Sequence, residues 1–241
     1  MHGHTDDPQA EHNRLLLALP RADYQRLLPA LETVSLAHGR VLFEARERIT
    51  HVYFPQHCVV SLLTLVSDGP PVEVAIVGNE GMVGVGVFLG ANTAKTRAVS
   101  QIPDDARRMT VRAFRRALID DAALQRLMLR YTQTLLGQIA QCAACNQRHS
   151  VEQRCARWLL MAHDRVGTDH FSLTQECLGQ VLDVRRPTVS AAARHLYKVG
   201  AIRYSRGKIS ITSRACLERA ACMCYRMIDE DYARAFGSPR G

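Results

Sequence analysis

Two adjacent arginines, Arg185 and Arg186, carry the side chains with the clearest chemical use in this sequence. Pro187 follows them, and proline favours the first turn of a helix because its fixed φ suits that position. A guanidinium group at the start of a helix can enter the major groove of DNA and donate two parallel hydrogen bonds to a guanine. The side chains predicted to contact bases from this helix are Arg185, Arg186, Ser190 and Arg194.

These residues fall in the second half of a helix-turn-helix pattern that runs from about Thr174 to Val199. Thr174 can cap the first helix, and Asp183 and Val184 form the turn. Apolar residues at helical spacing give each helix a buried face. The alternative, an ordinary helical hairpin with solvated arginines, stays open for this pattern alone. The residues expected to be buried are Cys177, Leu178, Val181, Leu182, Val189, Ala192, Ala193 and Leu196.

After Gly200 the segment AIRYSRGKISI predicts two short strands joined by a turn, as in a winged helix. Residues Ser150 to Ile211 carry a net charge of +5, out of +8 for the whole chain. Because this basic segment coincides with the motif, the expected partner is double-stranded DNA. The residues expected to contact phosphates are Thr174, Gln175, Thr188, Arg203, Arg206 and Lys208.

The N-terminal half has a different pattern. From Val34 to about Val111, short β-rich runs are separated by Gly, Pro, Asn and Asp, which predicts a small antiparallel roll or barrel. The glycine-rich stretch from Gly78 to Asn92 has the order GxxGxG, the reverse of the dinucleotide fingerprint, and no Walker sequence follows it. We interpret these glycines as turns of the roll.

A long helix is predicted from about Ala122, because apolar residues there alternate at spacings of four and three. We interpret this heptad seam as the contact with a second copy in a homodimer. A second set (Leu127, Leu136, Ile139, Ala143) would then pack on the roll, although the seam could pack there instead. The seam consists of Leu124, Met128, Tyr131, Leu135, Gln138, Cys142, Cys145 and His149.

The chain therefore divides into four predicted segments. Ser150 and Gln153 form a capping box that begins a new helix, and this marks the boundary of the last segment. The segments are a flexible arm (1–12), a β-roll sensor domain (13–121), a dimerisation helix (122–149) and a winged helix-turn-helix domain with a helical tail (150–241).

Composition limits the possible classes of protein. The chain has 241 residues, 47% of them hydrophobic, but no apolar run long enough for a membrane span and no secretory signal, so a cytoplasmic protein without a membrane partner is expected. Eight scattered cysteines in a chain of this size indicate reduced thiols. Because GxSxG and HExxH motifs are absent from the sequence, we do not expect an enzyme.

The cysteines allow a second hypothesis. Cys142 and Cys145 form a CxxC on the long helix and could bind a metal or pair with thiols of a partner chain, which would make the protein a redox or metal sensor. The alternative is that they are small buried hydrophobes. Cys222 and Cys224, in the helical tail, are predicted to be packing residues.

The order of roll, long helix, capped helix and winged helix resembles the Crp/Fnr family of transcription regulators, from about Asn13 to Ile211. The segment LTQECLGQVLDVRRPTVS is similar to the family's helix-turn-helix at Thr174, Gly179 and Thr188, among others. The resemblance implies an α+β fold with a cyclic-nucleotide-binding-like roll. It also implies a homodimer on a near-palindromic operator, and contact with RNA polymerase.

Two residues depart from the family's base-reading pattern. Many members carry Glu where this chain has Pro187 and Arg where it has Ala191, so the resemblance does not extend to their operator sequence. What it does imply is Arg186 as a guanine reader and Ser190 as a second base contact.

The sensory half departs further. Cyclic-nucleotide-binding members carry Gly-Glu-(Leu/Met) and Arg-(Ser/Thr)-Ala, where the carboxylate holds the ribose and the arginine the phosphate. This chain reads Gly81-Met82-Val83 and Thr96-Arg97-Ala98, and the polar positions of the long helix correspond to Ile139 and Ala140. No cyclic AMP is therefore expected, and no iron–sulfur cluster either, since the chain has no cysteine before Cys58. Candidate effector-pocket residues are Glu80, Gly81, Met82, Thr96 and Arg97.

Overall fold

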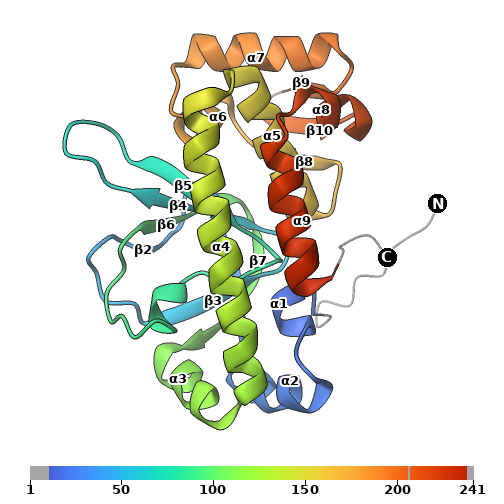
Figure 1. Ribbon diagram of the computed structural model, residues 1–241. Helices are drawn as coiled ribbons and strands as arrows, with labels where there is room; N and C mark the ends of the chain where they lie inside the picture. The colour runs from blue at the N-terminus through green and yellow to red at the C-terminus, as the bar shows by residue number, and fades with distance from the viewer. Residues whose placement is uncertain (1–10, 206, 238–241) are drawn as a thin grey trace.

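The N-terminal half of the protein is a β-roll and the C-terminal half a winged helix, with one long helix running past both (Figure 1). The structure is a computed structural model and describes residues 11–205 and 207–237. Its antiparallel sheets and separate helices confirm the predicted α+β fold class. Among the described residues, no helix is both long and apolar enough to cross a membrane.

The roll consists of two antiparallel sheets, with strand orders β2-β6-β4-β5 and β1-β7-β3. β-branched and aromatic side chains of these strands, such as Val52, Phe54 and Ile76, fill the core. The strands are β1 (Glu32–Leu36), β2 (Val41–Phe43), β3 (His51–Pro55), β4 (Val59–Thr64), β5 (Val72–Val77), β6 (Arg97–Ile102) and β7 (Asp104–Thr110). A 3-10 turn, η2 (Val85–Val87), lies in the glycine-rich segment, which supports its interpretation as turns.

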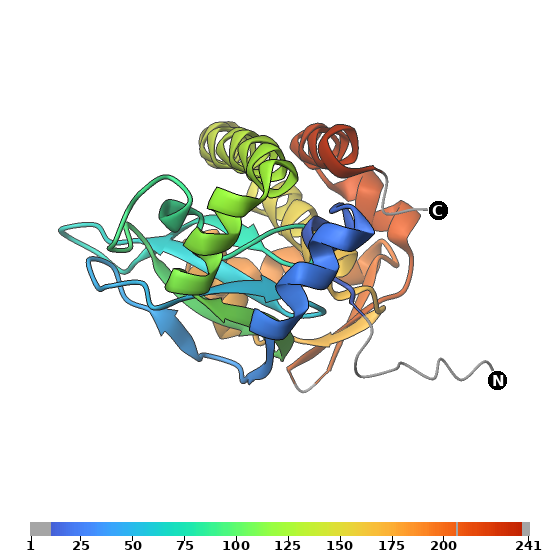
Figure 2. The same cartoon turned by 90° about the horizontal axis from the view of Figure 1, so that it is seen from below.

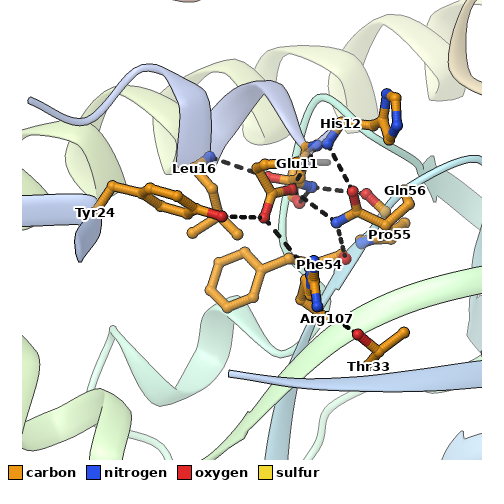
Figure 3. Close-up of polar contacts among 11 residues, drawn as sticks. Glu11, His12, Leu16, Tyr24, Thr33, Phe54, Pro55, Gln56 and Arg107 are labelled. Atoms are coloured by element: carbon orange, nitrogen blue, oxygen red, sulfur yellow. Dashed lines mark hydrogen bonds and ion pairs between the residues drawn. The ribbon is translucent and has the colours of Figure 1, made fainter. Parts of the chain in front are cut away.

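The first residues that the structure describes, Glu11 and His12, are held against the roll by polar contacts (Figure 3). The Glu11 carboxylate accepts hydrogen bonds from Gln56 Nε2 at 2.8 Å and from the Tyr24 hydroxyl at 3.1 Å, and it lies 3.9 Å from Arg107. The His12 backbone N–H donates to Gln56 Oε1 at 2.7 Å. Glu11 and His12 are thus anchored, contrary to the predicted flexible arm, while residues 1–10 of that arm lie outside the described part of the chain.

Short helices follow this anchor and lead into the roll. They are α1 (Arg14–Leu17), α2 (Arg21–Leu27) and the 3-10 turn η1 (Leu28–Ala30). Asn13 caps α1 by accepting from Leu16 N, and its side-chain amide donates to the carbonyls of Pro55 and Gly81 at 2.9 Å each. One buried asparagine therefore holds the first helix against two segments of the roll.

The long helix α4 (Ala122–Arg148) follows α3 (Val111–Asp120) and spans about 40 Å at the usual rise per residue. Asp121 caps it by accepting from the backbone N–H groups of Ala123 and Leu124. The last helix among the described residues, α9 (Cys224–Phe236), runs beside α4 on one face of the molecule (Figures 1 and 2). The helical tail thus returns to the long helix.

The heptad seam of α4 faces the protein's own interior, so its assignment to a second copy is wrong. The Tyr131 hydroxyl donates to Met82 O and Gln138 Nε2 donates to Ile76 O, both at 2.9 Å. The apolar face of a helix must be buried against another element, and here the roll and α9 of the same chain bury it. The seam residues buried in this way are Leu124, Met128, Tyr131, Leu135, Gln138, Cys142 and Cys145, and His149 is half-buried.

A different stripe of α4 is exposed. Leu129 and Leu136 are 60% and 57% exposed, and they are one heptad apart. Of the second set, which we predicted to pack on the roll, Leu127 is buried but Leu136 and Ala143 are exposed. We call the exposed residues Leu129, Gln133, Leu136, Ala140 and Ala143 the outer face of α4.

The C-terminal half forms a winged helix, as predicted. A strand that the sequence analysis missed, β8, pairs with the wing to give the sheet order β8-β10-β9. The elements are α5 (Val151–Val166), β8 (His170–Ser172), α6 (Gln175–Leu182), α7 (Arg186–Lys198), β9 (Ile202–Ser205), β10 (Lys208–Ile211) and α8 (Arg214–Ala220).

Candidate nucleic-acid interface

The two helices of the helix-turn-helix are held by local contacts. Thr174 Oγ1 caps α6 by accepting from Cys177 N at 3.1 Å. Asp183 adopts a left-handed φ of 50°, which aspartate tolerates better than most residues, and this closes the turn. A Cβ on Gly179 would lie 3.1 Å from the Val184 carbonyl, so a small residue is needed at this crossing.

Helix α7 presents one buried and one exposed face. Pro187 occupies its first turn, as the sequence predicted, and Val189 is fully buried. The helix contains no acidic residue, so its exposed face is basic and polar. Figure 1 shows α7 at one end of the molecule, with its outer side uncovered. The exposed residues are Arg186, Pro187, Thr188, Ala191, Arg194, His195, Tyr197 and Lys198.

The structure separates the four predicted base readers into two kinds. Arg185, Arg186 and Arg194 are exposed. Ser190 is half-buried, and its hydroxyl donates to Gln175 Oε1 at 2.9 Å. This contact joins a predicted base reader on α7 to a predicted phosphate contact on α6, a pairing that the sequence analysis missed.

Two of the predicted phosphate contacts, Thr174 and Gln175, line a cleft between the wing and the two helices. The cleft has a volume of about 520 Å³, and Thr174, Gln175, Arg186 and Gly207 are among its lining residues. Thr174 and Gln175 lie at the N-terminal end of α6, where unpaired backbone N–H groups favour an anion. Glu176 also lines the cleft and introduces an opposing charge. Thr188, Arg203 and Lys208 are exposed nearby in the sequence, whereas Arg206 lies outside the described residues.

The winged helix is docked onto the roll through α5 and α6. Trp158 Nε1 donates to Glu73 Oε1 on β5 at 2.8 Å, and His38 Nε2 lies 3.4 Å from Cys177 Sγ. Burial raises the pKa of the Glu73 carboxyl to about 7, although hydrogen bonds from Ser61 and Trp158 oppose the shift. These contacts connect the winged helix with the β-roll.

Charged residues of the candidate effector pocket are used elsewhere. The buried Glu80 carboxylate lies 2.9 Å from Arg165 on α5, and it also accepts from Gly78 N. Burial is the largest single influence and would lower the pKa of the Arg165 guanidinium, but Glu80, Tyr232 and Asp164 together raise that pKa above its ordinary value. Arg97, by contrast, pairs with Glu44 at 3.2 Å and lines a cleft against α6. The structure therefore does not bring Glu80 and Arg97 together.

The remaining cassette residues are packed by the protein itself. Met82 is 1% exposed, and Thr96 is half-buried near the start of β6. A Cβ on Gly81 would lie 2.5 Å from the Tyr131 ring, and one on Gly78 would lie 2.5 Å from Arg165. Side chains from α4 and α5 thus fill the space beside the glycine-rich turn.

Comparison with known proteins relates the C-terminal domain to a helix-turn-helix family and the fold to several solved structures. Residues 153–220 match the family model of the Crp-like helix-turn-helix domain. The structure is similar to FixK2 from Bradyrhizobium japonicum (TM-score 0.68, 19% identity, 80% of this chain and 98% of that one). It is also similar to a CRP-family transcriptional regulator from Thermus thermophilus (TM-score 0.64, 18% identity, 78% and 96%). No curated protein sequence matches the chain.

A third similar structure is the c-di-GMP-responsive regulator CLP of Xanthomonas campestris (TM-score 0.61, 13% identity, 80% of this chain and 100% of that one). The fold is that of Crp/Fnr-type transcription regulators. The predicted resemblance is confirmed, because this chain combines that fold with a Crp-like helix-turn-helix domain.

Proposed function

We propose that this protein is a sequence-specific DNA-binding transcription regulator that acts as a homodimer and has no enzymatic activity. The observation that carries the proposal is the exposed, arginine-bearing face of α7, which contains no acidic residue. The major groove of B-DNA is about 12 Å wide and admits one α-helix. The wing and the N-terminal end of α6 lie beside α7, where they would contact phosphates.

Base reading is expected to depend mainly on Arg186. Pro187 and Ala191 have no side-chain hydrogen-bonding group, so these two exposed positions can offer only apolar contact. Arg186 lies at the N-terminal end of α7, the part of a recognition helix that meets base edges. A bidentate arginine discriminates guanine from other bases by about 1–3 kcal/mol.

Replacing Arg186 with alanine is expected to weaken binding to the preferred duplex about 5- to 150-fold while changing binding to random duplex much less. The preferred duplex would first be selected from a random pool, and affinities then measured by fluorescence anisotropy at several salt concentrations. Arg203→Ala, on the wing, is the matched control: it should weaken both duplexes alike and lower the salt slope by about 1. Equal weakening of both duplexes by Arg186→Ala would contradict the assignment.

The homodimer is proposed to form through the outer face of α4. One of its two exposed leucines, Leu129, lines a groove of about 510 Å³ between α4 and α9, together with Gln133 and Asp231 among others. A two-fold dimer would place two α7 helices in successive major grooves, with half-sites one helical turn apart. By resemblance to the Crp/Fnr family, we also propose a cytoplasmic location and contact with RNA polymerase.

Cyclic AMP is not the proposed effector. Glu80, the carboxylate within the glycine-rich segment, is already paired with Arg165, and Arg97 lies at a different cleft. Isothermal titration of the full chain with cyclic AMP is therefore expected to give no saturable heat. Binding of micromolar affinity, with one site per chain, would overturn this expectation.

A further inference from the structure

Three cysteines and one histidine meet where the end of α4 faces the junction of α8 and α9. Cys145 Sγ lies 3.5 Å from Cys222 Sγ, and Cys224 Sγ lies 3.5 Å from His149 Nδ1. One potential ligand atom from each of the four residues lies within 4.8 Å of all the others. The three cysteines are buried and the histidine is half-buried. We call this group the C-terminal thiol cluster.

Local structure explains why these side chains converge. Cys145 and His149 are four residues apart, so they lie on the same side of the helix end, and the His149 N–H donates to Cys145 O at 3.0 Å. Cys222 and Cys224 stand on either side of Met223, where the chain turns from α8 into α9. The packing of α9 along α4 then places one pair against the other.

We propose that the C-terminal thiol cluster binds a single zinc ion through Cys145, His149, Cys222 and Cys224. Structural zinc sites are tetrahedral, with Zn–S bonds of about 2.3 Å and Zn–N bonds of about 2.0–2.1 Å. Those bond lengths place neighbouring ligand atoms about 3.5–3.8 Å apart. The two closest pairs already match this spacing, and the 4.8 Å spread needs only small side-chain adjustments.

The neighbouring polar side chains suit an anionic metal centre. Gln141 Nε2 donates to Cys224 Sγ at 3.0 Å, a contact that would stabilise a thiolate. The buried Arg157 donates to Cys142 Sγ at 2.8 Å, and its charge also acts on Cys145 and Cys222. Arg157 Nε has no hydrogen-bond partner among the described residues. Zinc with three thiolates and a neutral imidazole carries a net charge of −1, which this buried cation would balance.

Other uses of the cluster explain less of its geometry. Simple packing, which the sequence predicted for Cys222 and Cys224, does not explain why His149 and Gln141 direct nitrogen atoms at sulfur. A Cys145–Cys222 disulfide would leave Cys224 and His149 without a purpose. The CxxC pair proposed from the sequence is divided, because Cys142 contacts Arg157 in the main core while Cys145 belongs to the cluster.

The position of the site gives it a structural consequence. The four ligands lie just outside both ends of the Crp-like domain, which spans residues 153–220. A bound ion would therefore join the end of α4, which precedes that domain, to the start of α9, which follows it. Because a site of this kind does not exist in the unfolded chain, metal binding would stabilise the fold.

The test uses the full chain, purified under reducing conditions. Elemental analysis is expected to give one zinc per chain, and cobalt replacement should give the visible absorption of tetrahedral thiolate-bound Co²⁺. Cys145→Ser and His149→Ala should each lower the bound zinc at least about tenfold. Cys216→Ser is the matched control, because Cys216 is a half-buried thiol on α8 outside the cluster, and it should keep the zinc.

A second measurement does not depend on the folding of variants. In the unmodified chain, zinc should protect Cys145, Cys222 and Cys224 from alkylation, and a chelator should expose them, while Cys216 reacts equally in both conditions. Any one of three results would overturn the proposal. The reduced protein would bind neither zinc nor cobalt, the purified protein would contain a Cys145–Cys222 disulfide, or Cys216→Ser would lose as much zinc as Cys145→Ser.

Discussion

Replacing Arg165 with methionine is expected to lower the free energy of unfolding by about 3–5 kcal/mol. The substitution leaves the Glu80 carboxylate, which is 3% exposed, without its cation and without the hydrogen bond from Arg165 Nε. It also removes a hydrogen bond to Gln138 Oε1 on α4. Urea unfolding followed by circular dichroism would measure the loss.

Two further variants separate charge pairing from general damage. Arg234→Met removes an exposed arginine that pairs with Asp231, and such a surface change should stay within about 0.5 kcal/mol. Glu80→Leu combined with Arg165→Met removes both buried charges, so it should be more stable than Arg165→Met alone. A loss below about 1 kcal/mol for Arg165→Met would show that the pair is not needed for stability.

The Glu80–Arg165 pair also links the two halves of the protein. Glu80 belongs to the glycine-rich turn of the roll, and Arg165 to the first helix after α4. The pair therefore serves as a buried joint between the roll and the first helix of the C-terminal half.

Elements with strong local signals could be predicted from the sequence. Thr174, Pro187 and Gly200 mark the ends of the two helices of the helix-turn-helix because capping, proline and glycine act over a few residues. The short β-rich runs of the roll, separated by Gly, Pro, Asn and Asp, are a similarly local signal. The missed strand, β8, has only three residues and forms because β10 pairs with it.

Contacts between distant segments could not be predicted in this way. The heptad pattern of α4 revealed an apolar stripe but not its cover, because α9 begins 76 residues after the end of α4. Glu80 and Arg165 are 85 residues apart, and Cys145 and Cys222 are 77 apart. The CxxC spacing pairs Cys145 with Cys142, which is not part of the C-terminal thiol cluster. The cluster instead combines the spacings Cys145-x3-His149 and Cys222-x-Cys224.

Because the heptad seam of α4 is buried within the chain, the expected dimer contact moves to the outer face of α4. The substitution Leu136→Arg tests this contact and is expected to have the largest effect on DNA binding. A guanidinium there would place like charges opposite each other at a two-fold contact. The variant should be monomeric by light scattering. It should bind the full operator at least about 100-fold more weakly, because the two half-sites would no longer be held by one linked dimer.

Leu17→Arg provides the matched control, because Leu17 is also 57% exposed but lies on α1. That variant should stay dimeric and keep its operator affinity. A monomeric Leu136→Arg with unchanged affinity would mean that one winged helix is sufficient for operator binding. A dimeric Leu136→Arg would place the contact elsewhere. The first result would remove the need for two α7 helices on one operator, and the second would remove the assignment of the dimer contact to the exposed Leu129 and Leu136.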